Sequence, residues 1–174
     1  MEIKVPTCNA NGELEIIASA TSAKEDFDFF IGKWKLKNRK LKTRLNGCTE
    51  WIEFEATQED HKALQGLANI DHFYACIDNM PFEGMTIRLF DRATQLWNIY
   101  WADSNAGKLD TPVVGSFENK IGHFFAKDIF QGKDILVVFR WDSTDANNPV
   151  WSQAFSTDNG KKWEWNWYMY MSKA

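Results

Sequence analysis

The chain has 174 residues, 44% of them hydrophobic, and a formal net charge of -4 at pH 7. This length predicts a single domain, and the mildly acidic balance disfavours a nucleic-acid surface, which requires a basic patch. We find no early segment typical of a signal peptide and no apolar run long enough to cross a membrane, so we expect a cytoplasmic protein. Three cysteines without a CxxC pair indicate reduced thiols rather than disulfides or a zinc ribbon.

Residues 1–24 are mixed and polar, and we interpret them as an N-terminal arm that packs loosely on a domain formed by residues 25–174. Within the arm, "IIASATSAKED" (16–26) could form a short helix. "DFDFFIGKW" (26–34) gathers three phenylalanines before a glycine and a tryptophan. This pattern predicts a short helical turn that leads into the first strand.

The rest of the chain alternates short strand patterns with turn residues such as "LNG", "DRAT" and "STDNG". "ATQEDHKALQ" (56–65) is the only further helix candidate. With so little helix to cover a flat sheet, we expect closure into an all-β, single antiparallel barrel. The ten predicted strands are 33–41, 49–57, 66–76, 84–90, 96–102, 112–117, 121–130, 134–141, 150–156 and 162–171.

Several stretches of the sequence resemble a known family of β-barrel proteins. "FDFFIGKWKL" (27–36) resembles the entry of lipocalin-like (calycin) barrels, in which G-x-W, here Gly32 to Trp34, starts the first strand. "LKTRLNGCTEWIEFE" (41–55), "VVGSFENKIGHFFAKDIFQGKDILVVFRW" (113–141) and "WSQAFSTDNGKKWEWNW" (151–167) resemble an uncharacterised bacterial family of such barrels. The likeness spans roughly residues 26–172.

The resemblance implies a ten-stranded barrel with an interior, and it implies that a cation packs over Trp34, with Lys173 as the candidate. Relatives in the superfamily include fatty-acid-binding proteins, haem-binding nitrobindins and a few enzymes such as phenolic acid decarboxylases. The resemblance therefore does not identify what the barrel binds.

The last strand, "KKWEWNWYMY" (161–170), has two faces that both look unlike solvent surface. In one assignment Trp163, Trp165, Trp167 and Met169 face inward and form a core wall, which hydrophobicity favours. In the other, Glu164, Asn166, Tyr168 and Tyr170 face inward as a polar ligand surface. The tryptophan face would then lie outside, and a homodimer is an expected consequence.

Strand alternation and the G-x-W resemblance select the residues that we expect to line a ligand cavity. Asn69, Asp71, Glu53 and Asp103 are further polar candidates, but a solvated strand face is the simpler interpretation for each. The basic cluster "KWKLKNRKLKTR" (33–44) is likewise interpreted as a solvated strand face. The expected ligand-binding residues are Trp34, Arg88, Trp101, Trp151, Gln153, Glu164, Asn166 and Tyr168.

Other chemistries have weaker support. Haem would need an axial ligand such as His72 or His123, but a lone strand histidine is more often structural. We find no metal-ligand spacing and expect no metal site or resident cofactor. A decarboxylase- or cyclase-like enzyme could use residues such as Arg88, Glu164, Tyr100 and Tyr168, yet the sequence fixes no mutual geometry. We expect no catalytic residues, no nucleic-acid or membrane partner, and binding of a small amphipathic or aromatic molecule inside the barrel.

Overall fold

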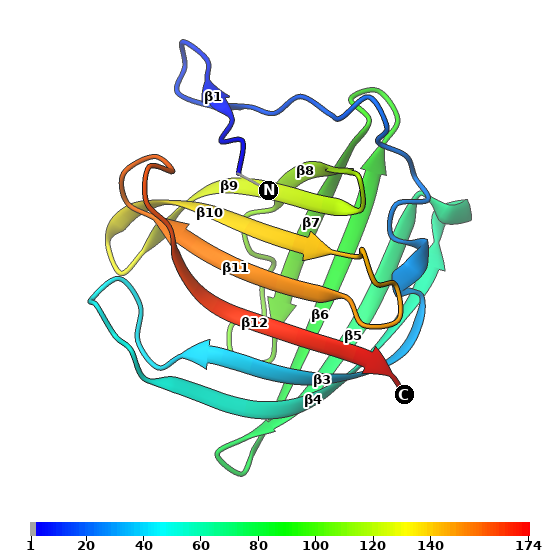
Figure 1. Ribbon diagram of the computed structural model, residues 1–174, viewed down its shortest axis with the longest axis vertical. Helices are drawn as coiled ribbons and strands as arrows, with labels where there is room; N and C mark the ends of the chain where they lie inside the picture. Colours follow the sequence, from blue (N-terminus) through cyan, green and yellow to red (C-terminus); the bar gives the residue numbers. More distant parts are fainter. Residues whose placement is uncertain (1–2) are drawn as a thin grey trace.

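A computed structural model describes residues 3–174 of the chain. Ten antiparallel strands form a closed barrel in the order β10-β11-β12-β3-β4-β5-β6-β7-β8-β9 (Figure 1). The all-β barrel predicted from the strand and turn pattern is confirmed. The barrel strands are β3 (Gly32–Leu41), β4 (Trp51–Ala63), β5 (Ala68–Ile77), β6 (Met80–Asp91), β7 (Leu96–Asp103), β8 (Val113–Glu118), β9 (Ile121–Phe130), β10 (Lys133–Asp142), β11 (Val150–Ser156) and β12 (Glu164–Lys173).

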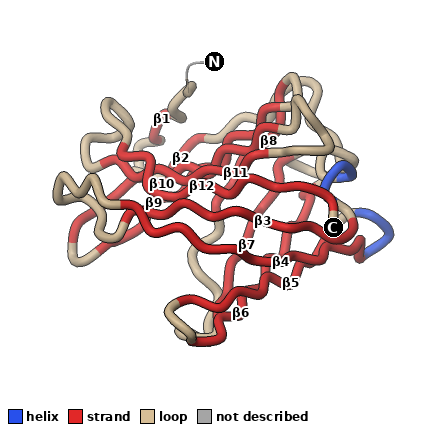
Figure 2. Tube along the Cα trace, turned by 60° about the horizontal axis from the view of Figure 1, so that its bottom comes forward, coloured by secondary structure: helices blue, strands red, loops and turns tan. Residues whose placement is uncertain are grey.

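Helical structure within residues 3–174 is confined to two 3₁₀ turns, η1 (Asp28–Phe30) and η2 (Leu64–Gly66). Both lie at the same end of the barrel, close to the C-terminus (Figure 2). The helical turn predicted ahead of the first strand is thus present. The short helix expected within residues 16–26 does not form, and the candidate at 56–65 mostly continues β4. Of these helical segments, none has the length and apolar character required to span a membrane.

The N-terminal arm contains a small hairpin of β1 (Thr7–Cys8) and β2 (Leu14–Glu15), which stands beside the barrel (Figure 1). Ile3, Leu14 and Ile16 pack against an apolar patch on the outer surface of β9, β10 and β11. Farther along, the Trp97 indole donates a 3.2 Å hydrogen bond to the Ala23 carbonyl. The Ser19 N–H donates to Ser116 Oγ, and the Ser22 hydroxyl donates to the Gln95 carbonyl, so the arm is attached to the barrel at several places. The three cysteines are unpaired.

A cluster of aromatic side chains fills one end of the barrel. Phe27 and Phe30, carried by the η1 turn, are almost completely buried. Phe27 meets Trp97, Phe117 and Trp141 edge to face, with ring centroids 5.0–5.7 Å apart. Edge-to-face packing of this kind stabilises a core beyond the burial of area alone. The η1 turn therefore plugs this end, and the space that remains lies toward the other end.

Lys173, on the last strand β12, packs against this plug. Its ammonium lies 3.7 Å from the centroid of the Trp34 ring and faces the carbonyls of Phe29 and Ile31 at 3.5 and 3.3 Å. Trp34 is fully buried, and its indole donates a 2.6 Å hydrogen bond to the Phe30 carbonyl. The cation over Trp34 that the calycin resemblance implied is present, and Lys173 supplies it.

Candidate functional site

The barrel interior contains a cavity of about 280 Å³. It opens at the end opposite η1, where the hairpin loops after β3, β9 and β11 gather on the left of Figure 1. Its wall is mainly aromatic and aliphatic because every barrel strand turns alternate side chains inward. The apolar lining consists of Ile99, Trp101, Val113, Ala126, Phe130, Val137, Phe139, Trp141, Trp151, Phe155, Trp167, Met169 and Met171.

Arg88 lies at the floor of the cavity and is 2% exposed. Its guanidinium forms an ion pair with Asp71 at 2.6 Å and donates a 2.8 Å hydrogen bond to the side-chain oxygen Oδ1 of Asn69. The guanidinium carbon also lies 5.1 Å from the ring centroids of Phe27 and Phe30. Arg88 therefore joins the polar floor to the aromatic plug.

A second carboxylate, Asp60, lies beside this pair, with Oδ1 3.8 Å from Arg88 Nη1. Its side chain is fully buried, and neither oxygen accepts a hydrogen bond of ordinary geometry within residues 3–174. Burial raises the pKa of Asp60 to about 7; Arg88 opposes this rise, while the charge of Asp71 adds to it. Two carboxyl groups thus share one guanidinium, and the more weakly paired one titrates near neutrality.

Above this cluster, the side chains of Gln58 and Thr86 face the cavity. The Oε1 atom of Gln58 is buried, and within residues 3–174 it has no hydrogen-bond partner. Buried polar atoms are normally paired, so an unpaired one in a cavity wall indicates where an occupant or a water molecule would bind.

The mouth of the cavity carries charges of both signs. Lys40 and Arg44 lie on one part of the rim, and Asp103, Asp110 and Asp128 lie on another. Burial lowers the pKa of both cations, that of Lys40 to about 8. Burial, followed by the charges of Asp103 and Asp128, raises the pKa of Asp110. An entering molecule therefore passes between a cationic edge and an acidic edge.

The last strand combines the two assignments that the sequence left open. Gln153 of β11 pairs with Trp167, whereas the next residue, Ala154, pairs with Trp165. Asn166 has no counterpart and forms a β-bulge, which reverses the inward and outward alternation of β12. On one side of the bulge Trp167 and Met169 face inward.

On the other side, Trp163 and Trp165 lie outside and pack against the outer patch that the N-terminal arm covers. The tryptophan face that led us to expect a homodimer is therefore split, and its outer part is half-buried by the chain's own arm.

Four of the eight expected site residues line the cavity, namely Arg88, Trp101, Trp151 and Gln153. Trp34 lies deeper, within the plug. Asn166 is fully buried and accepts a 2.8 Å hydrogen bond from the Gln153 amide.

The remaining two expected residues lie apart from this group. Glu164 is occupied at the rim, where its carboxylate accepts the Leu45 backbone N–H at 2.8 and 2.9 Å. Tyr168 stacks between Trp165 and Tyr170 on the outer surface. The expectation of a surface role for Asn69 and Asp71 is wrong, since both are buried beside Arg88.

Sequence reasoning missed Lys40, Arg44, Gln58 and Asp60. The signal for Lys40 was present, because it shares the parity of Trp34, Leu36 and Asn38, whereas the other cations of β3 have the opposite parity. Lys33, Lys35, Lys37 and Arg39 are exposed on the outer face, as predicted for a solvated strand face. Treating the basic cluster as one unit concealed the single lysine that turns inward.

The histidines do not fit a haem site in this cavity. His61 and His72 lie on the outer surface with ring centroids 6.2 Å apart. His123 faces away from the interior, since its neighbour Phe124 is the inward residue. Burial lowers the pKa of His123 to about 4, and the Arg140 charge adds to this effect. Residues 3–174 also hold no cluster of three or more His, Cys, Asp or Glu suited to a metal ion.

The residues considered for an enzyme do not converge on one point. Arg88 lies at the cavity floor, whereas Tyr168 stacks on the outer surface and the carboxylate of Glu164 is bound by the loop after β3. Tyr100 alternates with the inward residues Ile99 and Trp101 and so faces outward.

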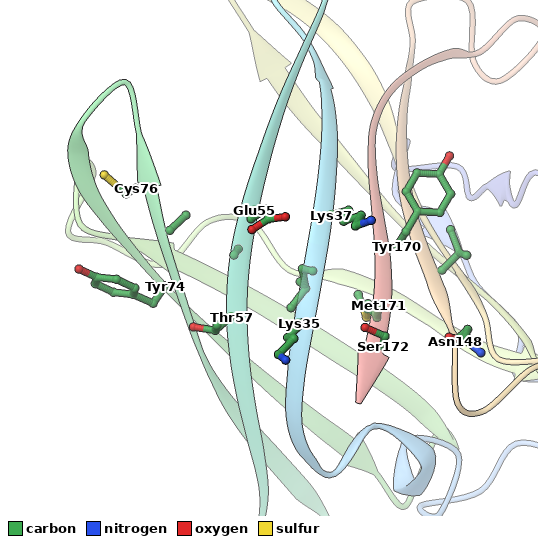
Figure 3. A pocket seen from close by; sticks show the side chains of 14 residues that line it. Lys35, Lys37, Glu55, Thr57, Tyr74, Cys76, Asn148, Tyr170, Met171 and Ser172 are labelled. Atoms are coloured by element: carbon green, nitrogen blue, oxygen red, sulfur yellow. The ribbon is translucent and has the colours of Figure 1, made fainter. Parts of the chain in front are cut away.

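A wider depression of about 630 Å³ lies on the outer surface, across β5, β4, β3 and β12. Figure 3 shows Tyr74 and Tyr170 on its opposite sides, with Lys35, Thr57 and Glu55 between them. It is larger than the interior cavity, but it is more open to solvent. The enclosed, aromatic interior is the better candidate site, because small-molecule sites are concave and mostly apolar.

No protein-family model matches the chain, and no curated protein matches it either. The barrel is consistent with the calycin resemblance at the level of the fold.

Proposed function

We propose that the protein binds a small aromatic or amphipathic molecule inside the barrel, without transforming it. The observation that carries this proposal is an aromatic cavity of about 280 Å³ with an unpaired buried acceptor, Gln58 Oε1. The ring system would lie among Trp101, Trp151 and Phe139. A hydrogen-bond donor on the molecule would reach Gln58.

The volume of the cavity limits the size of the molecule that it can hold. At roughly 30 Å³ per water molecule, the space corresponds to about nine waters. This lies at the small end of the range for ligand sites, so a molecule of one or two rings suits it better than a long acyl chain. The charged rim would tolerate a polar group at the outer end of the occupant.

Titration calorimetry with 2-naphthol, which has two rings and one hydroxyl donor, tests the proposal. The wild-type protein is expected to bind it in the micromolar range. Ala126→Phe places a ring in the cavity wall, and binding should weaken by at least about tenfold, equal to about 1.4 kcal/mol.

Lys127→Phe is the matched control, since residue 127 is exposed on the outer face of the same strand. It should bind like the wild type. Circular dichroism and thermal unfolding would show that both variants are folded. Absence of binding to the wild type, or equal weakening in both variants, would refute the proposal.

A further inference from the structure

Lys40 is the one lysine in residues 3–174 whose side chain lines the interior cavity. It lies near the end of β3, and its amine is 4.0 Å from the centroid of the Trp167 ring. Within the described chain the amine belongs to no ion pair or side-chain hydrogen bond, in contrast to Lys33, Lys42 and Lys62. A primary amine is therefore held at the mouth of a mainly apolar cavity, outside any ion pair among the described residues.

The surroundings favour the neutral, nucleophilic form of this amine. Burial is the main cause of its lowered pKa of about 8, and the Arg44 charge adds to it, whereas Asp103 opposes it. A lysine with the usual pKa near 10.4 would be only about one part in a thousand neutral at pH 7.5. With a pKa near 8, roughly a quarter would be neutral at that pH.

We propose that Lys40 forms a reversible imine with an aldehyde group carried by an aromatic ligand. The inference rests on the proposed function, because the cavity must first bind the aromatic ring. The amine nitrogen attacks the carbonyl carbon and a carbon–nitrogen double bond forms. The carbonyl oxygen leaves as water with the two amine hydrogens, so no oxidant or reductant is required.

The cavity also provides groups that would stabilise the protonated imine. A protonated imine is a cation, and the Trp167 ring beneath Lys40 stabilises a cation by its π face. Asp103 lies on the opposite part of the rim, where the Trp101 indole donates a 3.3 Å hydrogen bond to its carboxylate. Asp103 would act as the counter-ion, together with the neighbouring Asp110 and Asp128.

The experiment is reductive trapping with 4-hydroxybenzaldehyde and cyanoborohydride at pH 7.5, followed by peptide mass mapping. Lys35 and Lys37 are internal controls, because they lie on the same strand but face solvent. Lys40 should be labelled at least ten times faster than either control. This preference should already be present at pH 7.5, because part of the Lys40 amine is neutral just below its pKa of about 8.

The matching alcohol, 4-hydroxybenzyl alcohol, separates the two claims, because it has the same ring but cannot form an imine. If calorimetry shows that the alcohol binds but Lys40 is labelled no faster than Lys35 and Lys37, the imine is refuted while the proposed function stands. If neither compound binds and Lys40 is not preferred, both claims fail. Lys40→Met should lose the fast labelling, and Lys37→Met, on the outer face of the same strand, should change neither the labelling of Lys40 nor alcohol binding.

Discussion

The side-chain amide of Gln153 donates a 2.8 Å hydrogen bond to the side-chain oxygen of Asn166, and both residues are buried. Asn166 is the bulged residue of β12, and Gln153 lies opposite the bulge on β11. The bond therefore joins the two strands at the point where β12 exchanges its inward and outward faces. It also fixes one polar position in the cavity wall, since Gln153 lines the cavity.

Removing this bond should destabilise the barrel. Asn166→Ala leaves a buried amide donor on Gln153 unpaired, which costs about 1–3 kcal/mol. For a chain of this size we expect the melting temperature to fall by roughly 2–4 °C for each kcal/mol.

The double variant Gln153→Ala/Asn166→Ala provides the control. It should be more stable than the sum of the two single losses predicts, because the unpaired partner is also removed. Strict additivity in a denaturant series would contradict a direct bond.

Lys173→Met should loosen the plug at the closed end, because it removes the cation over Trp34 and two hydrogen-bond donors to backbone carbonyls. A cation over an aromatic ring contributes about 0.5–2 kcal/mol, so a loss of that order is expected in the free energy of unfolding. Lys173→Arg keeps the cation and should recover most of the loss. Equal unfolding midpoints for all three proteins would show that Lys173 has no such role.

Asp60 should make the protein less stable as the pH rises. Its pKa is about 7 in the folded protein and 3.8 ordinarily, so between these values the folded state binds a proton that the unfolded state releases. Stability therefore falls as the pH rises from about 4 to about 7 and then levels off. Asp60→Asn lacks this titration, and its stability relative to wild type should increase across that window. A stability difference between the two proteins that does not change with pH would contradict a raised pKa of Asp60 in the folded protein.

His123 should have the opposite effect to Asp60 and make the protein less stable as the pH falls. Its pKa falls from 6.5 to about 4 on folding, so between these values the unfolded state is protonated and the folded state is not. Stability is fully present above pH 6.5 and is lost as the pH falls toward 4. His123→Gln should be less sensitive to acid than wild type in thermal unfolding scans. Because Asp60 opposes this trend over nearly the same window, the comparison is cleanest in the Asp60→Asn background. In that background, an identical dependence of thermal stability on pH with and without His123 would contradict a lowered pKa of His123 in the folded protein.

The sequence predicts the ten strands because alternation and turn residues are local properties. It also predicts part of the cavity wall, since the parity of Trp151 and Gln153 holds as long as a strand is regular. It fails at Asn166, because a bulge adds one residue to one strand and depends on what the neighbouring strand presents. It does not single out Asp60, and it wrongly favours a solvent-facing position for Asp71, since burial of a carboxylate depends on the distant Arg88.

The nine tryptophans provide the most direct test of binding inside the barrel. Each indole N–H gives its own signal in a ¹H–¹⁵N correlation spectrum, and these side chains lie in the plug, in the cavity wall and on the outer surface. During titration with 2-naphthol, we predict shifts for the four that line the cavity, Trp101, Trp141, Trp151 and Trp167. The outer-surface signals of Trp51, Trp163 and Trp165 should remain in place. Shifts confined to those three, or no shifts at saturating 2-naphthol, would contradict binding in the cavity.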